Sequence, residues 1–163
     1  MPDRPIAVFE PQCFVPVPAQ MYNHACQHGE LGPFQQVEAL SNATLTKAVN
    51  GGGRILAVNL PGPTSYMRYR ATRQGQHAIF SGSAGAGVEV QMFFNDEPLP
   101  KNDIEPVAAD LPCGELSWVT GFVLQQDMDY VVEIGPTRFQ DVKLFIESVE
   151  TFGAQDWSAS CDQ

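Results

Sequence analysis

Charged side chains are scarce in this chain, and basic ones are the scarcest. Asp, Glu, Lys and Arg make up 17% of the 163 residues, and 9 basic side chains stand against 19 acidic ones, for a net charge of −10 at pH 7. A surface of that charge repels phosphate backbones and anionic lipid headgroups. We therefore expect no nucleic-acid partner.

Long apolar runs are also absent. No stretch of about 18 apolar residues occurs, so the sequence predicts no membrane-spanning helix. The amino terminus lacks the pattern of a signal peptide, because its short apolar run is interrupted by Glu10 and Pro11. If the protein is exported, we expect its signal peptide to be absent from this chain.

Closely spaced cysteine pairs are missing as well. No CxxC motif occurs, so neither a zinc ribbon nor a thioredoxin-type redox centre is supported. The four cysteines, Cys13, Cys26, Cys113 and Cys161, are far apart and allow three pairings. In one pairing, Cys13–Cys161 would join the two ends of the chain and Cys26–Cys113 would connect an early segment to a later loop. Disulfides imply an oxidising compartment, so we expect an extracytoplasmic protein, periplasmic or secreted.

Glycine and proline are abundant, with 14 and 13 residues, and they separate short stretches of alternating apolar and polar residues. Such stretches are typical of strands, and no segment shows a convincing helical pattern. The turn Gln74-Gly75 predicts a hairpin between two of these stretches. The pattern as a whole predicts an all-β fold, an antiparallel β-sandwich of jelly-roll type with about eight strands. The expected strands are residues 34–40, 54–60, 65–71, 76–80, 88–94, 116–124, 130–134 and 142–149.

Proline density divides the chain into three parts. Five prolines in residues 1–22 disfavour a helix and a central strand, and predict an extended arm. Residues 23–152 are expected to form the β-sandwich domain. Residues 153–163 form a tail too short to be a domain of its own.

The densest cluster of possible metal ligands is His24, Cys26 and His28. In an extended segment the three side chains share one face, and imidazole nitrogen and thiolate sulfur suit copper or zinc. In a helix, His24 and His28 would share a face without Cys26. Glu30 or His77 could add a further ligand. The alternative is that Cys26 forms a disulfide and both histidines are exposed polar residues.

Other ion and catalytic sites have weaker support. Residues 95–110 are rich in acidic side chains, but their spacing does not fit a calcium-binding EF-hand loop, so calcium is the lesser expectation. No Gly-x-Ser-x-Gly motif is present to position a serine nucleophile. His77 lies in a strand pattern, where a packed or hydrogen-bonded ring is expected, and Asp127 and Asp129 lie in a turn. We expect a non-catalytic protein.

Three segments carry a resemblance to a known family. A strand, a glycine turn and a second strand run from Tyr66 to Phe80, an alternating strand ends at Asn95, and a late strand spans residues 129–135. Over roughly residues 54–149 they resemble bacterial pre-peptidase C-terminal-type domains, although Met128 or Asp129 stands where the family usually has glycine. The resemblance implies a secreted jelly-roll sandwich that serves attachment, targeting or ion-supported stability, without catalysis. It does not extend to His24 and His28.

These observations leave two main functional hypotheses. The first is an exported protein that binds copper or zinc through His24 and His28. The second is an accessory adhesion or carbohydrate-binding module, in which exposed aromatic side chains such as Tyr66, Trp118 or Trp157 stack on a glycan. A purely structural β-domain is a third alternative.

Overall fold

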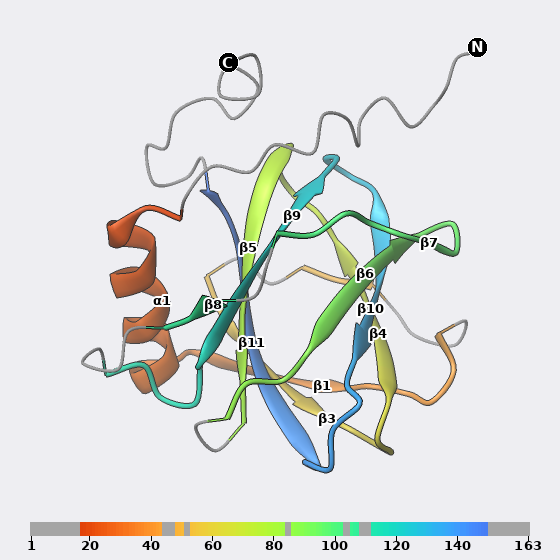
Figure 1. Cartoon of the computed structure of the whole chain (residues 1–163), viewed down its shortest axis with the longest axis horizontal. Helices are drawn as coiled ribbons and strands as arrows, with labels where there is room; N and C mark the ends of the chain where they lie inside the picture. Colours follow the sequence, from red (N-terminus) through yellow and green to blue (C-terminus); the bar gives the residue numbers. More distant parts are fainter. Residues whose placement is uncertain are drawn as a thin grey trace.

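The computed structural model describes residues 17–43, 48–50, 53–83, 86–102, 105–107 and 112–149. Two β-sheets lie face to face, and one helix packs beside them (Figure 1). The six-stranded sheet has the order β1 (Phe34–Glu38), β3 (Ile55–Asn59), β11 (Asp141–Ser148), β5 (Gly75–Gly82), β9 (Trp118–Leu124) and β8 (Glu105–Pro106). The five-stranded sheet has the order β2 (Ala48–Val49), β4 (Ser65–Arg70), β10 (Asp129–Ile134), β6 (Val90–Phe94) and β7 (Glu97–Pro98).

All eight expected strands are present, and the predicted β-sandwich is confirmed at this level. Both sheets are mixed rather than purely antiparallel, because β1 runs parallel to β3 and β2 runs parallel to β4. The predicted alternation along residues 65–71 is also confirmed. Met67 and Tyr69 are buried between the sheets, whereas Arg68 and Arg70 face outward.

The predicted hairpin at Gln74-Gly75 is wrong. β4 pairs with β10 in one sheet, whereas β5 pairs with β11 and β9 in the other. Every residue of β5 is buried, so this strand needs neighbours on both edges and cover on both faces, and it takes a central position in the larger sheet. The turn therefore carries the chain across the sandwich, with Gly75 at a φ of 116° that favours glycine.

The absence of a helix was also predicted wrongly. Helix α1 spans Ala19–Leu31 and begins directly after Pro18. The prolines restrict the chain only up to that point, and Pro is well tolerated where a helix starts, because the first backbone N–H groups have no partner within the helix. Its buried residues are Met21, Ala25 and Cys26. Ala25 and Cys26 follow Met21 by four and five positions, which places all three on one face of the helix.

Helix α1 covers the outer face of the six-stranded sheet. Its buried side chains pack with Ile55, Phe80 and Phe145 in a core separate from the one between the sheets. Tyr22 contacts Phe80 edge-on, with ring centroids 5.5 Å apart. Within the described parts of the chain, no helix is long and apolar enough to cross a membrane.

Parts of the predicted organisation fall outside these residues. The first 16 residues of the expected arm, the tail 153–163, and with them Cys13, Cys161 and Trp157, lie outside the described residues. The disulfide Cys26–Cys113 lies within the described residues and is formed. It is one of the two bonds in the pairing described above, and that bond is confirmed.

Candidate functional site

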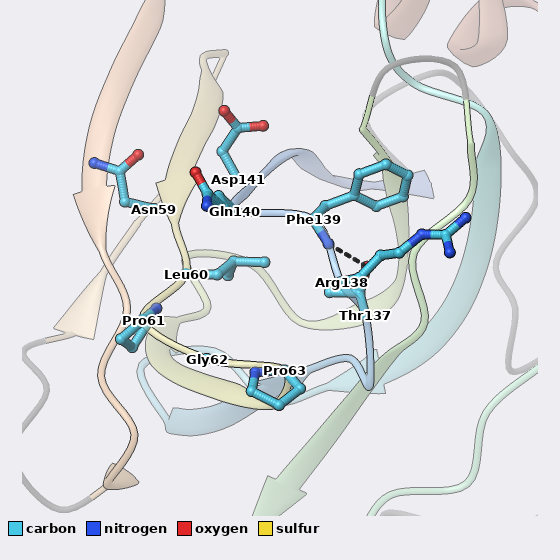
Figure 2. Close-up of a pocket in the computed structure, with 10 residues that line it drawn as sticks. All are labelled: Asn59, Leu60, Pro61, Gly62, Pro63, Thr137, Arg138, Phe139, Gln140 and Asp141. Carbon is cyan, nitrogen blue, oxygen red and sulfur yellow. Dashed lines mark hydrogen bonds between the residues drawn. The ribbon is translucent and has the colours of Figure 1, made fainter.

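A hollow with a volume of about 690 Å³ lies between two loops at one end of the sandwich (Figure 2). The loops Asn59–Pro63 and Thr137–Asp141 line it. They are joined by backbone hydrogen bonds, in which Thr137 N–H donates to the Pro63 carbonyl and Leu60 N–H to the Gln140 carbonyl, both at 2.8 Å. Most of the lining side chains are exposed or partly exposed, so we interpret this hollow as an open depression between turns.

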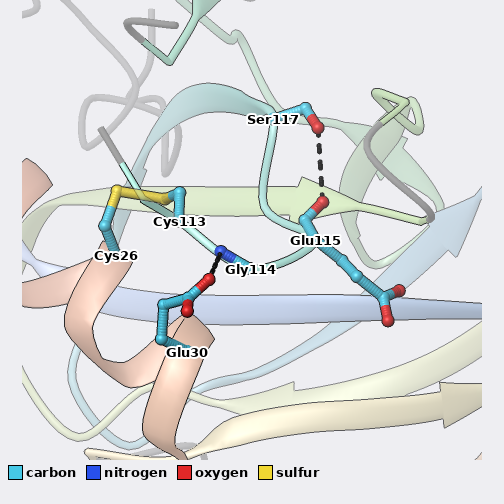
Figure 3. Close-up of a disulfide and its surroundings, with 6 residues drawn as sticks. All are labelled: Cys26, Glu30, Cys113, Gly114, Glu115 and Ser117. Atoms are coloured by element: carbon cyan, nitrogen blue, oxygen red, sulfur yellow. Dashed lines mark hydrogen bonds between the residues drawn. A yellow bond between two sulfur atoms is a disulfide. The ribbon is translucent and has the colours of Figure 1, made fainter. Parts of the chain in front are cut away.

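The disulfide fixes the predicted metal-ligand segment to a loop before β9 (Figure 3). Glu30 accepts a hydrogen bond of 2.8 Å from the Gly114 backbone N–H, one turn of helix after Cys26. Cys26 is therefore buried in a covalent bond and is not available as a thiolate ligand while that bond is intact. For Cys26 this is the alternative that the sequence left open, whereas the two histidines, which that alternative expects to be exposed, are partly buried.

His24 and His28 do lie together, on the side of α1 that meets the sheet. Their ring centroids are 4.6 Å apart, and both rings pack against Phe145, at 5.7 and 5.2 Å. Burial and the nearby His28 lower the pKa of His24. His28 Nδ1 donates to the Gly32 carbonyl at 2.8 Å, which leaves its Nε2 as the atom able to bind a ligand.

A third metal ligand is not brought to these rings. Within the described residues, no three side chains of His, Cys, Asp or Glu are arranged to hold a metal ion. Glu30 is engaged with Gly114. His77 lies on β5 with its side chain toward the space between the sheets, because it alternates with Ala78, which packs in the core under α1. Metal binding through the two histidines alone stays a prediction.

The outer face of the five-stranded sheet combines aromatic, aliphatic and hydrogen-bonding groups. We call it the β4–β10–β6 face and define it by six partly exposed residues. Register places them in two cross-strand rows, one centred on Val131 and the other on Glu133. The rows are Arg68–Val131–Phe93 and Tyr66–Glu133–Gln91.

Polar contacts between side chains stabilise the conformation of this face. Tyr66 Oη donates to Glu133 Oε2 at 3.1 Å, and at the next row Arg70 Nε donates to Asp129 Oδ1 at 2.8 Å. Arg68 forms no salt bridge with any described residue. A hollow of about 450 Å³ lies beside it, lined in part by Arg68, Phe93 and Asp129.

A smaller pocket of about 220 Å³ lies where β4 and β11 end and β5 begins. We call it the His77 pocket. It is lined by Gly53, Tyr69, Thr72, Arg73, His77, Ile146, Glu147 and Ser148. Three of these polar side chains are almost fully buried, with relative exposures of 2% for Tyr69, 1% for His77 and 4% for Ser148. The register pairs Ser148 with His77 across β11 and β5.

The chemistry of the His77 pocket follows from burial. His77 Nδ1 lies 2.9 Å from the Gly75 carbonyl oxygen, which can only accept, so Nδ1 carries the proton. Burial and the charge of Arg73 lower the pKa of His77 to about 4. The ring is therefore neutral at pH 7, and its Nε2 is an acceptor. Burial and the charge of Glu147 raise the pKa of Tyr69 to about 12, so its hydroxyl stays protonated.

One atom in this pocket has no partner. Ser148 Oγ is the only buried side-chain oxygen or nitrogen in the described residues that makes no hydrogen bond. Leaving such a group unpaired costs about 1–3 kcal/mol of folding free energy. Ser148 occupies the inward position that Val142, Leu144 and Ile146 occupy earlier on β11, so a polar residue at the end of an apolar series was the sequence signal for this site.

The aromatic side chains proposed as glycan contacts differ in exposure. Tyr66 lies on the β4–β10–β6 face and is partly exposed. Trp118 is only partly exposed, and its indole lies directly against Gly87, where no Cβ would fit. Trp118 is therefore a packing residue. Phe93, which the sequence analysis did not single out, lies in register beside Val131 on the same face as Tyr66.

The fold and these sites define the chain as a helix-covered β-sandwich with one open sheet face and one small polar pocket. No family model and no curated protein matches the chain.

Proposed function

We propose that the protein is an exported, non-catalytic module that binds a glycan on the β4–β10–β6 face. The observation that carries this proposal is the pairing of the two rows, which sets the phenyl ring of Phe93 and the phenol of Tyr66 beside guanidinium, carboxylate and amide groups. Sugars present apolar C–H faces and many hydroxyls, and their binding sites combine aromatic surface with a few fixed polar groups.

The charge of this face supports a neutral ligand. Arg70 is neutralised by Asp129, and Glu133 is hydrogen-bonded to Tyr66. The guanidinium of Arg68 forms no ion pair with any described residue. It lies between polar and apolar groups and can donate to ring or hydroxyl oxygens. An anionic polymer would meet the overall negative charge of the chain, which opposes its approach.

Strand pairing supports a jelly-roll topology for the sandwich. The first core strand, β3, pairs with the last, β11, and the pairs β4–β10, β5–β9 and β6–β7 are nested inside it. Nested pairing of this kind arises when one long antiparallel ribbon is rolled into two sheets. Jelly rolls include lectin domains. The resemblance to pre-peptidase C-terminal-type domains implies a related use in attachment and stays a prediction.

The disulfide supports export. Cys26 and Cys113 are bonded, and such bonds persist in oxidising compartments and are rare where thiols are kept reduced. Periplasmic or secreted localisation follows as part of the proposal.

Glycan-array binding tests this function directly. We expect wild-type protein to bind a defined set of neutral glycans, and Phe93→Ala or Arg68→Ala to lose most of that binding. Phe34→Ala is a matched control, because Phe34 is an aromatic residue with 51% exposure on β1 of the other sheet. Absence of any glycan binding, or equal loss in the Phe34 variant, would refute the proposal.

Transition-metal binding is the second candidate, and the proximity of the His24 and His28 rings favours it. A copper or zinc ion held there needs ligands beyond the two imidazoles, because these ions prefer four or more. Native mass spectrometry after metal titration distinguishes the cases. We expect one ion per chain in wild type and none in His24→Ala/His28→Ala, and unchanged stoichiometry would exclude the site.

A further inference from the structure

We propose that the His77 pocket binds a small neutral polyol of about the size of glycerol. Its three buried polar side chains come from both sheets, Tyr69 from β4, and His77 and Ser148 from β5 and β11. A ligand held by all three would therefore connect the two sheets. The site is separate from the β4–β10–β6 face, because Tyr69 and Tyr66 lie on opposite faces of β4. The inference does not depend on glycan binding there.

Strand alternation places the three side chains around the same space. Tyr69 packs in the core between the sheets. His77 alternates with Ala78, which packs in the other core, under α1. Ser148 continues the inward series of β11 that includes Ile146. The register pairs Ser148 directly with His77, and all three polar side chains line the pocket.

The polar groups of this pocket have unused hydrogen-bonding capacity. Ser148 Oγ is buried and makes no hydrogen bond. Neither the Tyr69 hydroxyl nor His77 Nε2 is hydrogen-bonded to a described residue, and the hydrogen bond of the His77 ring uses Nδ1. Buried polar groups in folded proteins are nearly always hydrogen-bonded to protein or to a bound molecule. Three such groups around one pocket therefore indicate a site for a hydrogen-bonding ligand.

The chemistry of these groups favours a ligand with hydroxyls. His77 Nε2 can only accept, because Nδ1 carries the proton of the neutral ring, so the ligand must supply a donor. The hydroxyls of Tyr69 and Ser148 can donate as well as accept, so the ligand must also offer acceptors. Each hydroxyl of a polyol does both. Its carbon chain can pack against Ile146, an apolar residue that also lines the pocket.

Charge excludes ionic ligands. Arg73 is exposed. Glu147 alternates with Ser148 on β11 and is in register with Ala78, so its side chain lies on the α1 face of the sheet and not between the sheets. Among the described residues, the buried side chains that line the pocket are therefore all neutral. A carboxylate or an ammonium bound among them would lose its hydration without gaining a counter-charge, which is costly.

The size of the pocket fits one small molecule. Its volume of about 220 Å³ corresponds to roughly seven water molecules at about 30 Å³ each, which is sufficient for a molecule of the size of glycerol. A bound polyol would replace several of these waters and retain hydrogen bonds to the same protein groups.

NMR titration of the full chain provides the test. The probes are glycerol and three analogues of similar size. In glycerate a carboxylate replaces one hydroxymethyl group, in serinol an ammonium replaces the central hydroxyl, and ethylene glycol dimethyl ether accepts hydrogen bonds but cannot donate them. We expect glycerol to shift the amide signals around Tyr69, His77 and Ser148, and the three analogues to bind at least fivefold more weakly.

Variants then assign the contacts. We expect Tyr69→Phe and Ser148→Ala each to weaken glycerol binding at least threefold, because each removes one hydroxyl and keeps most of the shape of the side chain. Tyr130→Phe and Ser81→Ala are matched controls. Their hydroxyls belong to buried residues as well, but they are hydrogen-bonded to backbone groups and do not line the pocket. We expect wild-type affinity in both controls, and thermal unfolding of every variant verifies that it is folded.

Three results would overturn the proposal. Absence of glycerol binding would mean that the pocket holds water only. Equal binding of glycerate, serinol or the diether would show that the site does not select neutral hydroxyls. Signal shifts confined to the β4–β10–β6 face, or glycerol binding unchanged in Tyr69→Phe and Ser148→Ala, would place the ligand elsewhere.

Discussion

The backbones of Gly29 and Cys113 touch, and a Cβ added at Gly29 would collide with the Cys113 carbonyl oxygen. Gly29 lies on α1, and Cys113 precedes β9, so this contact sets how closely the helix approaches the loop. The disulfide and the Glu30–Gly114 hydrogen bond lie on either side of it. Glycine at this position therefore serves packing and not flexibility.

Replacing Gly29 by alanine should destabilise the protein. Alanine gains about 1 kcal/mol in helix propensity, but the collision with backbone atoms forces the helix away from the loop, and overpacking of this kind costs about 1–3 kcal/mol. We expect a net loss of stability in urea unfolding. Gly62→Ala is the control, because nothing lies within 4 Å of a Cβ there. A stabilised Gly29→Ala protein would contradict the close contact.

Removing the disulfide should have a larger effect. The bond joins residues 87 positions apart, and constraining a loop of that length in the unfolded state contributes about 4 kcal/mol. We expect the free energy of unfolding, measured with urea, to be lower in Cys26→Ala/Cys113→Ala by most of that amount. We expect a similar decrease in the reduced wild-type protein. Equal stability of the oxidised and reduced proteins would show that the bond does not constrain the fold.

Stability should fall on acidification because of His77. Above pH 6.5 the ring is neutral in both states and contributes nothing. Between pH 6.5 and about pH 4 the His77 ring binds a proton in the unfolded chain but not in the folded protein, because burial lowers its pKa to about 4 in the folded state. Below that pH the ring is protonated in both states. The loss of unfolding free energy is then complete and amounts to about 3 kcal/mol, calculated from the difference between the two pKa values.

The measurement is the difference between wild type and His77→Gln in urea unfolding at pH 7 and pH 4.5. Burial raises the pKa of Glu147, so this group stabilises the folded protein as the pH falls, which is opposite to the effect of His77. The pKa of His24 is lowered, so its effect on stability has the same sign as that of His77. Both are common to the two proteins and cancel in the difference. We expect the variant to have the flatter profile, and parallel profiles would mean that His77 is accessible to protons in the folded state.

Ser148→Ala should leave stability unchanged or raise it by up to about 1 kcal/mol. The hydroxyl is buried and unpaired, so its removal ends a desolvation cost and breaks no hydrogen bond within the protein. Thermal unfolding in ligand-free buffer measures this. Destabilisation would show that the hydroxyl has a partner in solution. The matched variant Ser81→Ala should destabilise, because Ser81 Oγ donates to the Val88 carbonyl at 2.8 Å.

The strands could be predicted from the sequence because alternation is a local property. Val142, Leu144 and Ile146 are buried at every second position, and the same periodicity is visible in the amino-acid order. The pairing of β5 could not be predicted, because Gln74-Gly75 is compatible both with a hairpin and with a crossing between sheets. Only the complete burial of β5 decides between them.

The helix and the pocket escaped prediction for different reasons. Prolines before Ala19 concealed a helix whose apolar stripe, Met21, Ala25 and Cys26, is narrow. The His77 pocket depends on the register that brings Ser148 opposite His77. Two residues so far apart in the chain meet only after the sheet has formed, and no local pattern encodes that contact.

The covalent link to Cys113 also decides what the protein does when it is reduced. Helix α1 lies on the sheet and β1, the strand that follows it, is an edge strand with one partner, β3. Without the disulfide, we expect α1 to separate from the sheet more readily and to expose Phe80 and Phe145, both of which are fully buried in the oxidised protein. An exposed aromatic patch promotes self-association, so we expect the reduced protein to aggregate more readily than the oxidised one.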